Sequence, residues 1–138
     1  MTKKDICKCQ QNTDKKIMFT FDDSVFCCMK CNLPIKKEIQ REEIVSWHSE
    51  YYTIYHLWLL SGAYEEWANI ELQNINSKIN QIGLKISREE KCYYWLHQDN
   101  HEQVDNDKNC PICGSKMEDY ENSILLQKVC KKCFIVTT

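Results

Sequence analysis

The sequence predicts a small α+β protein in which a central segment of about three helices is flanked by two cysteine-rich β modules. Three observations indicate this class. Nine of the ten cysteines lie near the two ends of the chain, the segment between them lacks proline and repeats apolar residues at helical spacing, and 43% of the 138 residues are hydrophobic. The predicted division is an N-terminal module over residues 1–37, a helical core over 38–100, a polar linker over 101–109 and a C-terminal module over 110–138.

The N-terminal module carries its cysteines at two places, Cys7 with Cys9 and a later group of Cys27, Cys28 and Cys31. Between them, residues 19–21 (Phe-Thr-Phe) alternate as a strand does, and residues 22–24 (Asp-Asp-Ser) have the composition of a turn. We therefore expect a hairpin that brings the two cysteine groups together.

Helical periodicity dominates the middle of the chain. The first predicted helix ends near Ser61-Gly62, where glycine favours a C-cap, and a shorter helix follows. The third begins near Ser77 and runs to about His97, although Gly83 and a capping-box sequence at 87–90 leave a break inside it open. The apolar positions that define the three helices are Ile44, Trp47 or His48, Tyr51, Tyr55, Trp58 and Leu59, then Tyr64, Trp67, Ala68 and Leu72, then Ile75, Ile79, Ile82, Ile86 and Tyr93.

The C-terminal module has the cysteine spacing of a zinc ribbon. Two CxxC pairs, with sixteen residues between them, offer four sulfur ligands, which are Cys110, Cys113, Cys130 and Cys133. Gly114 lets the backbone turn with positive φ after the first pair. Short strands are expected at 124–126 and 134–136. Because about 30 residues bury too little apolar surface to fold alone, zinc should supply much of the stability of this module.

A second structural zinc site is predicted at the N-terminal end, with ligands Cys7, Cys9, Cys28 and Cys31. The chain would then be a helical core flanked by two zinc-ribbon-like β modules. Two alternatives stay open: Cys27 ligates in place of Cys28, or the two ends share ligands in another combination. The first ten residues lack the apolar stretch that a secretory signal peptide requires, so a reducing, cytoplasmic location is expected. That location favours metal-bound cysteines over disulfides.

Charge is distributed unevenly although the net charge is only −2. Residues 1–37 hold eight lysines and four acidic residues, residues 38–107 hold five basic and thirteen acidic residues, and residues 108–138 hold five lysines and three acidic residues. Four thiolates around one Zn²⁺ carry about −2, so two zinc sites would remove most of the positive charge at the ends. The longest apolar run, residues 54–60, is too short to cross a bilayer, and no membrane partner is expected.

Nothing in the sequence indicates an enzyme. It contains no Gly-rich phosphate loop, nucleophile elbow or HExxH sequence, and eight thiolates close both predicted zinc sites. His97 and His101 are four residues apart, but no third ligand accompanies them, so a structural or surface role is expected. Cys92 stands alone beside two tyrosines and is expected to be a small buried residue.

Scattered motifs over about residues 40–138 resemble an uncharacterised bacterial family of zinc-ribbon-containing proteins that are described as nucleic-acid-binding. These motifs are Ser46-Trp47-His48-Ser49-Glu50-Tyr51, the Leu57–Gly62 segment, Asn76-Ser77, Gly83, the Tyr93–Leu96 segment and Cys110-Pro-Ile-Cys113-Gly. Cys7-Lys-Cys9 and Asn32-Leu-Pro34 are also similar to that family. The resemblance implies a bacterial cytosolic zinc protein. The present chain is shorter than the longer members, and its acidic middle departs from a nucleic-acid-binding pattern.

These features predict a non-enzymatic interaction protein in which two structural zinc ions brace a helical centre. Ten large aromatic residues lie between positions 47 and 95, too many for one buried helical stripe, and surface Tyr and Trp favour partner contacts. An acidic, aromatic surface suits a protein partner, for example when an immunity or inhibitor protein covers a basic nuclease or similar toxin. The alternative is a nucleic-acid-binding regulator whose phosphate contacts are Lys3, Lys4, Lys8, Lys15, Lys16, Lys128, Lys131 and Lys132.

Overall fold

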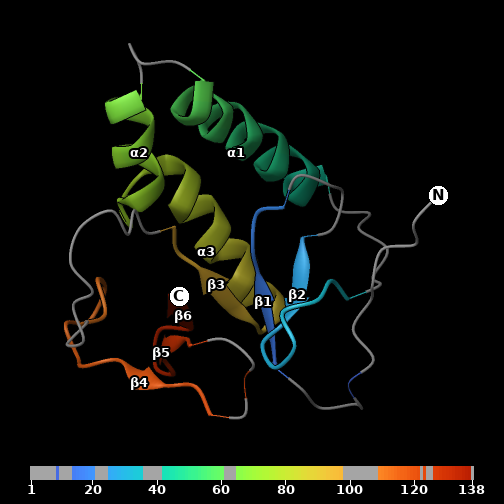
Figure 1. Ribbon diagram of the computed structural model, residues 1–138, viewed down its shortest axis with the longest axis vertical. Helices are drawn as coiled ribbons and strands as arrows, with labels where there is room; N and C mark the ends of the chain where they lie inside the picture. Colours follow the sequence, from blue (N-terminus) through green and yellow to red (C-terminus); the bar gives the residue numbers. More distant parts are fainter. Residues whose placement is uncertain are drawn as a thin grey trace.

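The computed structural model describes residues 9, 14–20, 25–35, 42–60, 65–97, 109–121, 123 and 126–137. Within these ranges the chain forms one mixed sheet with its helices gathered on one side (Figure 1). The predicted α+β class is therefore confirmed. The helices are α1 (Glu42–Leu60), α2 (Glu65–Gln73) and α3 (Lys78–Glu90), and the strands are β1 (Lys15–Ile17), β2 (Phe26–Cys28), β3 (Tyr93–Trp95), β4 (Glu118–Asp119), β5 (Lys128–Cys130) and β6 (Ile135–Thr137).

The strand order β2-β1-β3-β6-β5-β4 places β3 between strands from the two ends of the chain. β3 pairs in parallel with β1 and with β6, whereas the pairs β1–β2, β5–β6 and β4–β5 are antiparallel. The expectation that the third helix runs to about His97 is wrong, because residues Tyr93–Trp95 form β3. The strand β3, which follows the helices, thus joins the strands of both cysteine-rich modules into a single sheet.

The ends of α3 explain where the helix stops. The helix begins near Ser77, as predicted, and the Ser77 hydroxyl caps its N-terminus by accepting a hydrogen bond from the Asn80 amide at 3.4 Å. The break considered at 87–90 does not occur, because α3 continues to Glu90. Lys91 then adopts a left-handed conformation (φ 56°), and its N–H bonds to carbonyls of the last turn. This cap turns the chain into β3, which packs against α3.

The helices bury one face of the sheet. α3 contacts β1 and β3, and α1 packs against both α2 and α3. Trp47 of α1 lies edge-on to Tyr94 of β3, with ring centroids 6.2 Å apart, and its indole N–H donates to the carbonyl of Ile79 at 3.2 Å. Both aromatic side chains are fully buried. The main core therefore forms where the helical layer meets the middle of the sheet.

The opposite face of the sheet is closed by contacts between the two ends of the chain. Gln127, just before β5, donates from Nε2 to the carbonyl of Met29, just after β2, at 2.8 Å. Nearby, the hydroxyl of Tyr120 donates to Asp14 Oδ2 at 2.8 Å. Three strands separate β2 from β5 in the sheet, so these contacts require the sheet to curl. Under them lies a second apolar cluster of Met29, Tyr93, Val129 and Val136.

Several predicted strand positions differ from the observed ones. β1 precedes Phe19, whose ring stacks on Tyr51 of α1 at 4.9 Å. In the C-terminal module, Leu126 is exposed and lies outside β5, whereas β6 overlaps the expected strand. Residues 21–24 and 124–125 lie outside the described residues, as does the predicted linker up to residue 108.

Among the helices in the described ranges, none has the length and apolar composition needed to cross a membrane.

Candidate metal centres

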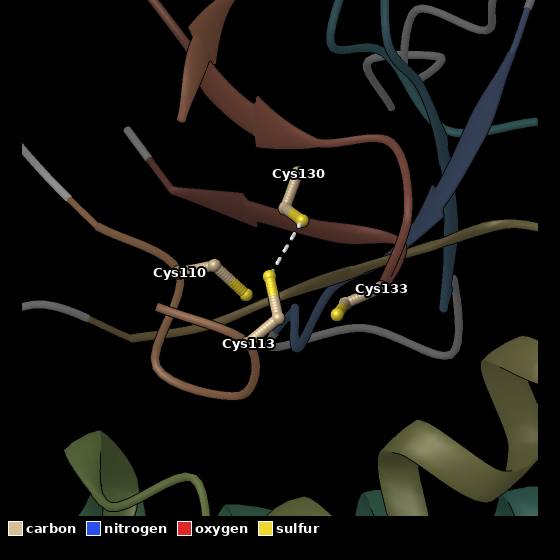
Figure 2. A group of neighbouring side chains, drawn as sticks. All are labelled: Cys110, Cys113, Cys130 and Cys133. Atoms are coloured by element: carbon tan, nitrogen blue, oxygen red, sulfur yellow. Dashed lines mark hydrogen bonds between the residues drawn. The ribbon is translucent and has the colours of Figure 1, made fainter. Parts of the chain in front are cut away.

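Four cysteines of the C-terminal module converge on one point (Figure 2). Their Sγ atoms all lie within 4.8 Å of one another, and they belong to Cys110, Cys113, Cys130 and Cys133. Cys130 ends β5, and Cys133 lies in the turn that leads to β6. The other two lie in the loop before β4. The structure thus brings together the four C-terminal residues that the spacing predicts as ligands.

The two CxxC turns of this centre share one backbone geometry. After Cys113, Gly114 has φ 76° and donates its N–H to the carbonyl of the first cysteine of the turn at 2.9 Å. After Cys133, Phe134 has φ 59° and makes the equivalent bond at 2.8 Å. The positive φ at Gly114 was expected from sequence, but phenylalanine rarely adopts this conformation. The tertiary structure therefore imposes it at Phe134.

The N-terminal group contains a third turn of the same kind. Asn32 follows Cys31 with φ 61° and donates its N–H to the carbonyl of Cys28 at 2.9 Å. The Sγ atoms of Cys9, Cys28 and Cys31 all lie within 4.8 Å of one another. Cys7, the fourth predicted ligand, lies outside the described residues. The three described members of the predicted set therefore form a cluster that can hold a metal ion.

The structure distinguishes Cys28 from its neighbour Cys27. Successive residues of a strand point to opposite faces, so the two side chains of β2 diverge. Cys28 joins the cysteine cluster, whereas Cys27 lies opposite Lys16 in the β1–β2 register and is buried. The common turn geometry also begins at Cys28 and not at Cys27. The alternative in which Cys27 replaces Cys28 is therefore not the arrangement found.

Sulfur spacing tests whether these groups fit a tetrahedral metal. A zinc–sulfur bond of about 2.3 Å places any two sulfurs of a regular tetrahedron about 3.8 Å apart. The Sγ atoms of Cys113 and Cys130 are 3.7 Å apart, far longer than a disulfide bond. None of the nine cysteines in the described ranges forms a disulfide. The C-terminal donor set thus fits a four-coordinate, thiolate-preferring metal ion.

The thiols of the C-terminal centre differ in acidity. Hydrogen bonds from the side chain and backbone of Ser115 lower the pKa of Cys113 to about 6. Burial, followed by the neighbouring thiols, raises the pKa of Cys133 to about 12, and burial likewise raises the pKa of Cys130. The Cys113 thiol is therefore readily ionised, whereas the thiols of Cys130 and Cys133 need a nearby cation to lose their protons. A bound metal would supply that charge and displace their protons.

The remaining candidate residues lie apart from both clusters. His97 is buried beside aromatic rings, of which Trp58 is nearest with centroids 4.9 Å apart. His101 lies outside the described residues, and Cys92 is buried after α3. Lys16 was a candidate phosphate contact of the nucleic-acid alternative, but this is wrong because its side chain is fully buried. Three residues that shape the clusters were not predicted from the sequence: Asn32 and Phe134, which adopt positive φ, and Ser115, which hydrogen-bonds to Cys113. Of these, only Asn32 could have been found, because asparagine tolerates positive φ.

Comparison of the chain with protein-family models, with curated proteins and with solved structures finds no match.

Proposed function

We propose that this chain is a non-enzymatic zinc-binding interaction protein in which two structural zinc ions hold the sheet together. The convergence of four thiols at the spacing of a tetrahedral site is the observation that carries the zinc assignment. The second ion would be held by Cys9, Cys28 and Cys31, with Cys7 as the fourth ligand. Sites closed by four thiolates leave no open coordination position, which favours a structural role over a catalytic one.

The charge of α1 and α2 supports a role in protein binding. From residue 42 to residue 73 the sequence contains six glutamates and no lysine or arginine. Glu43 pairs with Lys85 of α3 at 3.3 Å. Glu42, Glu50 and Glu71 form no ion pair with another described residue. This helical layer therefore presents uncompensated negative charge, which would attract a basic partner.

α1 also exposes apolar side chains. Val45, Tyr52 and Leu59 are each between 41% and 56% exposed. Their seven-residue spacing aligns them along one stripe of the helix, about 21 Å long at 1.5 Å per residue. Residues 51–60 of α1 contain no charged side chain, which is unusual for a helix with a solvent-facing side. The stripe can supply apolar contact area between the acidic positions.

The partner that fits this surface is a basic protein with an apolar contact patch. An immunity or inhibitor protein that covers a basic nuclease or similar toxin is one form of this function. The nucleic-acid alternative has less support, because Lys128 and Lys131 pair with acidic residues of β4 and Lys16 is buried.

Native mass spectrometry of the protein produced in zinc-containing medium tests the metal assignment. We expect two zinc ions per chain, and one ion after Cys110→Ser combined with Cys113→Ser. Cys92→Ser, which changes a cysteine outside both clusters, should retain both ions and serves as the matched control. Folded wild-type protein that holds no zinc would contradict the proposal.

A capture experiment tests the interaction surface. Immobilised protein is incubated with a nuclease-treated extract of the native cells, and retained proteins are identified. A specific partner should be lost with Tyr52→Glu combined with Leu59→Glu, and retained with Leu126→Glu, which alters an exposed leucine near the C-terminal centre. Retention of nucleic acid alone, removed by salt, would instead favour the regulator.

A further inference from the structure

Lys16 is a buried charged residue at the junction of the two cysteine-rich modules. Its side chain is 0% exposed, and its ammonium donates to Gln127 Oε1 at 2.7 Å. Ammonium groups are seldom fully buried unless a partner compensates the loss of hydration. A neutral amide oxygen supplies only part of that compensation. The position of Lys16 therefore needs a further explanation.

Gln127 is fully engaged in this junction. Its Nε2 donates to the carbonyl of Met29 at 2.8 Å and to Ser123 Oγ at 2.7 Å, while its Oε1 accepts from Lys16. Both amide hydrogens and the amide oxygen thus have partners, and the residue is 2% exposed. The glutamine links β1 to the segment that follows β2.

This network lies next to ligand segments of both centres. Met29 directly follows Cys28, and Gln127 lies three residues before Cys130. Lys16 lies opposite Cys27 in the register of β1 and β2. Burial lowers the pKa of Lys16 to about 8, whereas Cys27 and Cys28 act in the opposite direction and favour its ammonium form. The hydrogen bonds of Gln127 therefore join the backbone beside Cys28 to the segment that leads to Cys130.

We propose that Lys16 and Gln127 are positioning residues that couple the two cysteine centres, so that a metal ion in one centre strengthens metal binding in the other. This inference rests on the proposed zinc binding. A metal ion held by Cys28 would fix the adjacent Met29 carbonyl, which accepts a hydrogen bond from Gln127. An ordered C-terminal module keeps Gln127 in place, and Gln127 then forms hydrogen bonds with both the Lys16 ammonium and the Met29 carbonyl. Loss of either metal removes one of these supports, and such coupling is reciprocal.

Zinc titrations of the full chain against a competing chelator test the coupling. One variant lacks the C-terminal ligands (Cys110→Ser with Cys113→Ser), and another lacks the N-terminal ligands (Cys28→Ser with Cys31→Ser). We expect each remaining centre to bind zinc about tenfold more weakly than in the wild type, within the usual range of coupling between sites. Native mass spectrometry assigns the stoichiometry in each case.

The network variants complete the test. Lys16→Met should reduce the tenfold coupling to about twofold or less, whereas Lys85→Met, a matched change at an exposed lysine, should leave it intact. If Lys16→Met does not fold, Gln127→Glu keeps an acceptor for Lys16 but removes the donor to Met29, and should also weaken the coupling.

The outcomes separate this inference from the proposed function. Two zinc ions that bind with independent affinities, or coupling unchanged by Lys16→Met and Gln127→Glu, would overturn the coupling while leaving zinc binding in place. Absence of zinc from the folded wild type would overturn both.

Discussion

Tyr94 of β3 lies directly across Gly83 of α3. A Cβ atom built on Gly83 would lie 2.2 Å from Cε1 of the tyrosine ring, well inside any allowed contact. The missing side chain therefore lets α3 approach the sheet. The tyrosine hydroxyl passes the helix and donates to Asn80 Oδ1 at 2.6 Å. In turn, Asn80 Nδ2 donates to carbonyls at the end of α2, including that of Asn74 at 2.7 Å.

Gly83→Ala should destabilise the fold although alanine favours helices. The added methyl group must displace the Tyr94 ring or the helix, and overpacking of this kind costs about 1–3 kcal/mol or more. Urea unfolding monitored by circular dichroism measures the loss. Lys85→Ala, at an exposed position of α3, should change stability by less than about 0.5 kcal/mol. A smaller penalty for Gly83→Ala in a Tyr94→Leu background would identify the ring as the obstacle.

Tyr94 should make the fold sensitive to alkaline pH. Burial holds the pKa of this phenol well above its usual value of about 10, although Trp47 acts in the opposite direction. Above pH 10 the unfolded chain therefore releases a proton that the folded chain keeps, and stability falls by about 1.4 kcal/mol per pH unit. Below pH 10 this contribution is fully present.

Tyr94→Phe isolates this contribution. At pH 8 the variant should be less stable than the wild type by about 1 kcal/mol, because Asn80 loses its hydrogen-bond donor. Between pH 10 and 11 the difference should shrink as the wild type loses stability. Val45→Ala, which changes an exposed side chain that does not titrate, should show the wild-type pH profile. A constant difference between wild type and Tyr94→Phe across this pH range would count against the argument.

Asn32 should control the shape of the N-terminal centre. Its positive φ is easily adopted by glycine and costs roughly 1–2 kcal/mol for a residue with an ordinary side chain. Asn32→Gly should therefore keep wild-type zinc affinity, whereas Asn32→Ala should lower both the melting temperature and the affinity of this centre. Chelator competition measures the affinity. Equal behaviour of the two variants would show that the backbone conformation is unimportant.

Removal of metal should unfold the sheet at its ends. Zinc binding to the native state alone adds stability, and thiolate ligands must lose their protons to bind. We expect a chelator to lower the melting temperature and acidification to release zinc. Circular dichroism and a zinc-sensitive dye follow the two effects together. A melting temperature that does not respond to chelator would argue against structural metal ions.

The cysteine pattern and the helical repeat were sufficient to predict a large part of this molecule. CxxC spacing is a local property, because four consecutive residues define each turn and its sulfur directions. The four C-terminal cysteines therefore converge where the spacing predicts. The start of α3 at Ser77 is equally local, since one hydroxyl satisfies a nearby amide.

Tertiary structure decided the features that depend on distant partners. Tyr93–Trp95 continue the apolar pattern of a helix, yet they form β3 because β1 and β6 offer backbone partners on both sides. The pairing of β1 with β2 also places the buried Lys16 opposite Cys27, whereas Cys28 belongs to the cysteine cluster. Phe134 takes a glycine-like conformation because the turn between β5 and β6 requires it. Local sequence preferences set the turns and helices, but the energies of strand pairing and burial come from residues far apart in the chain.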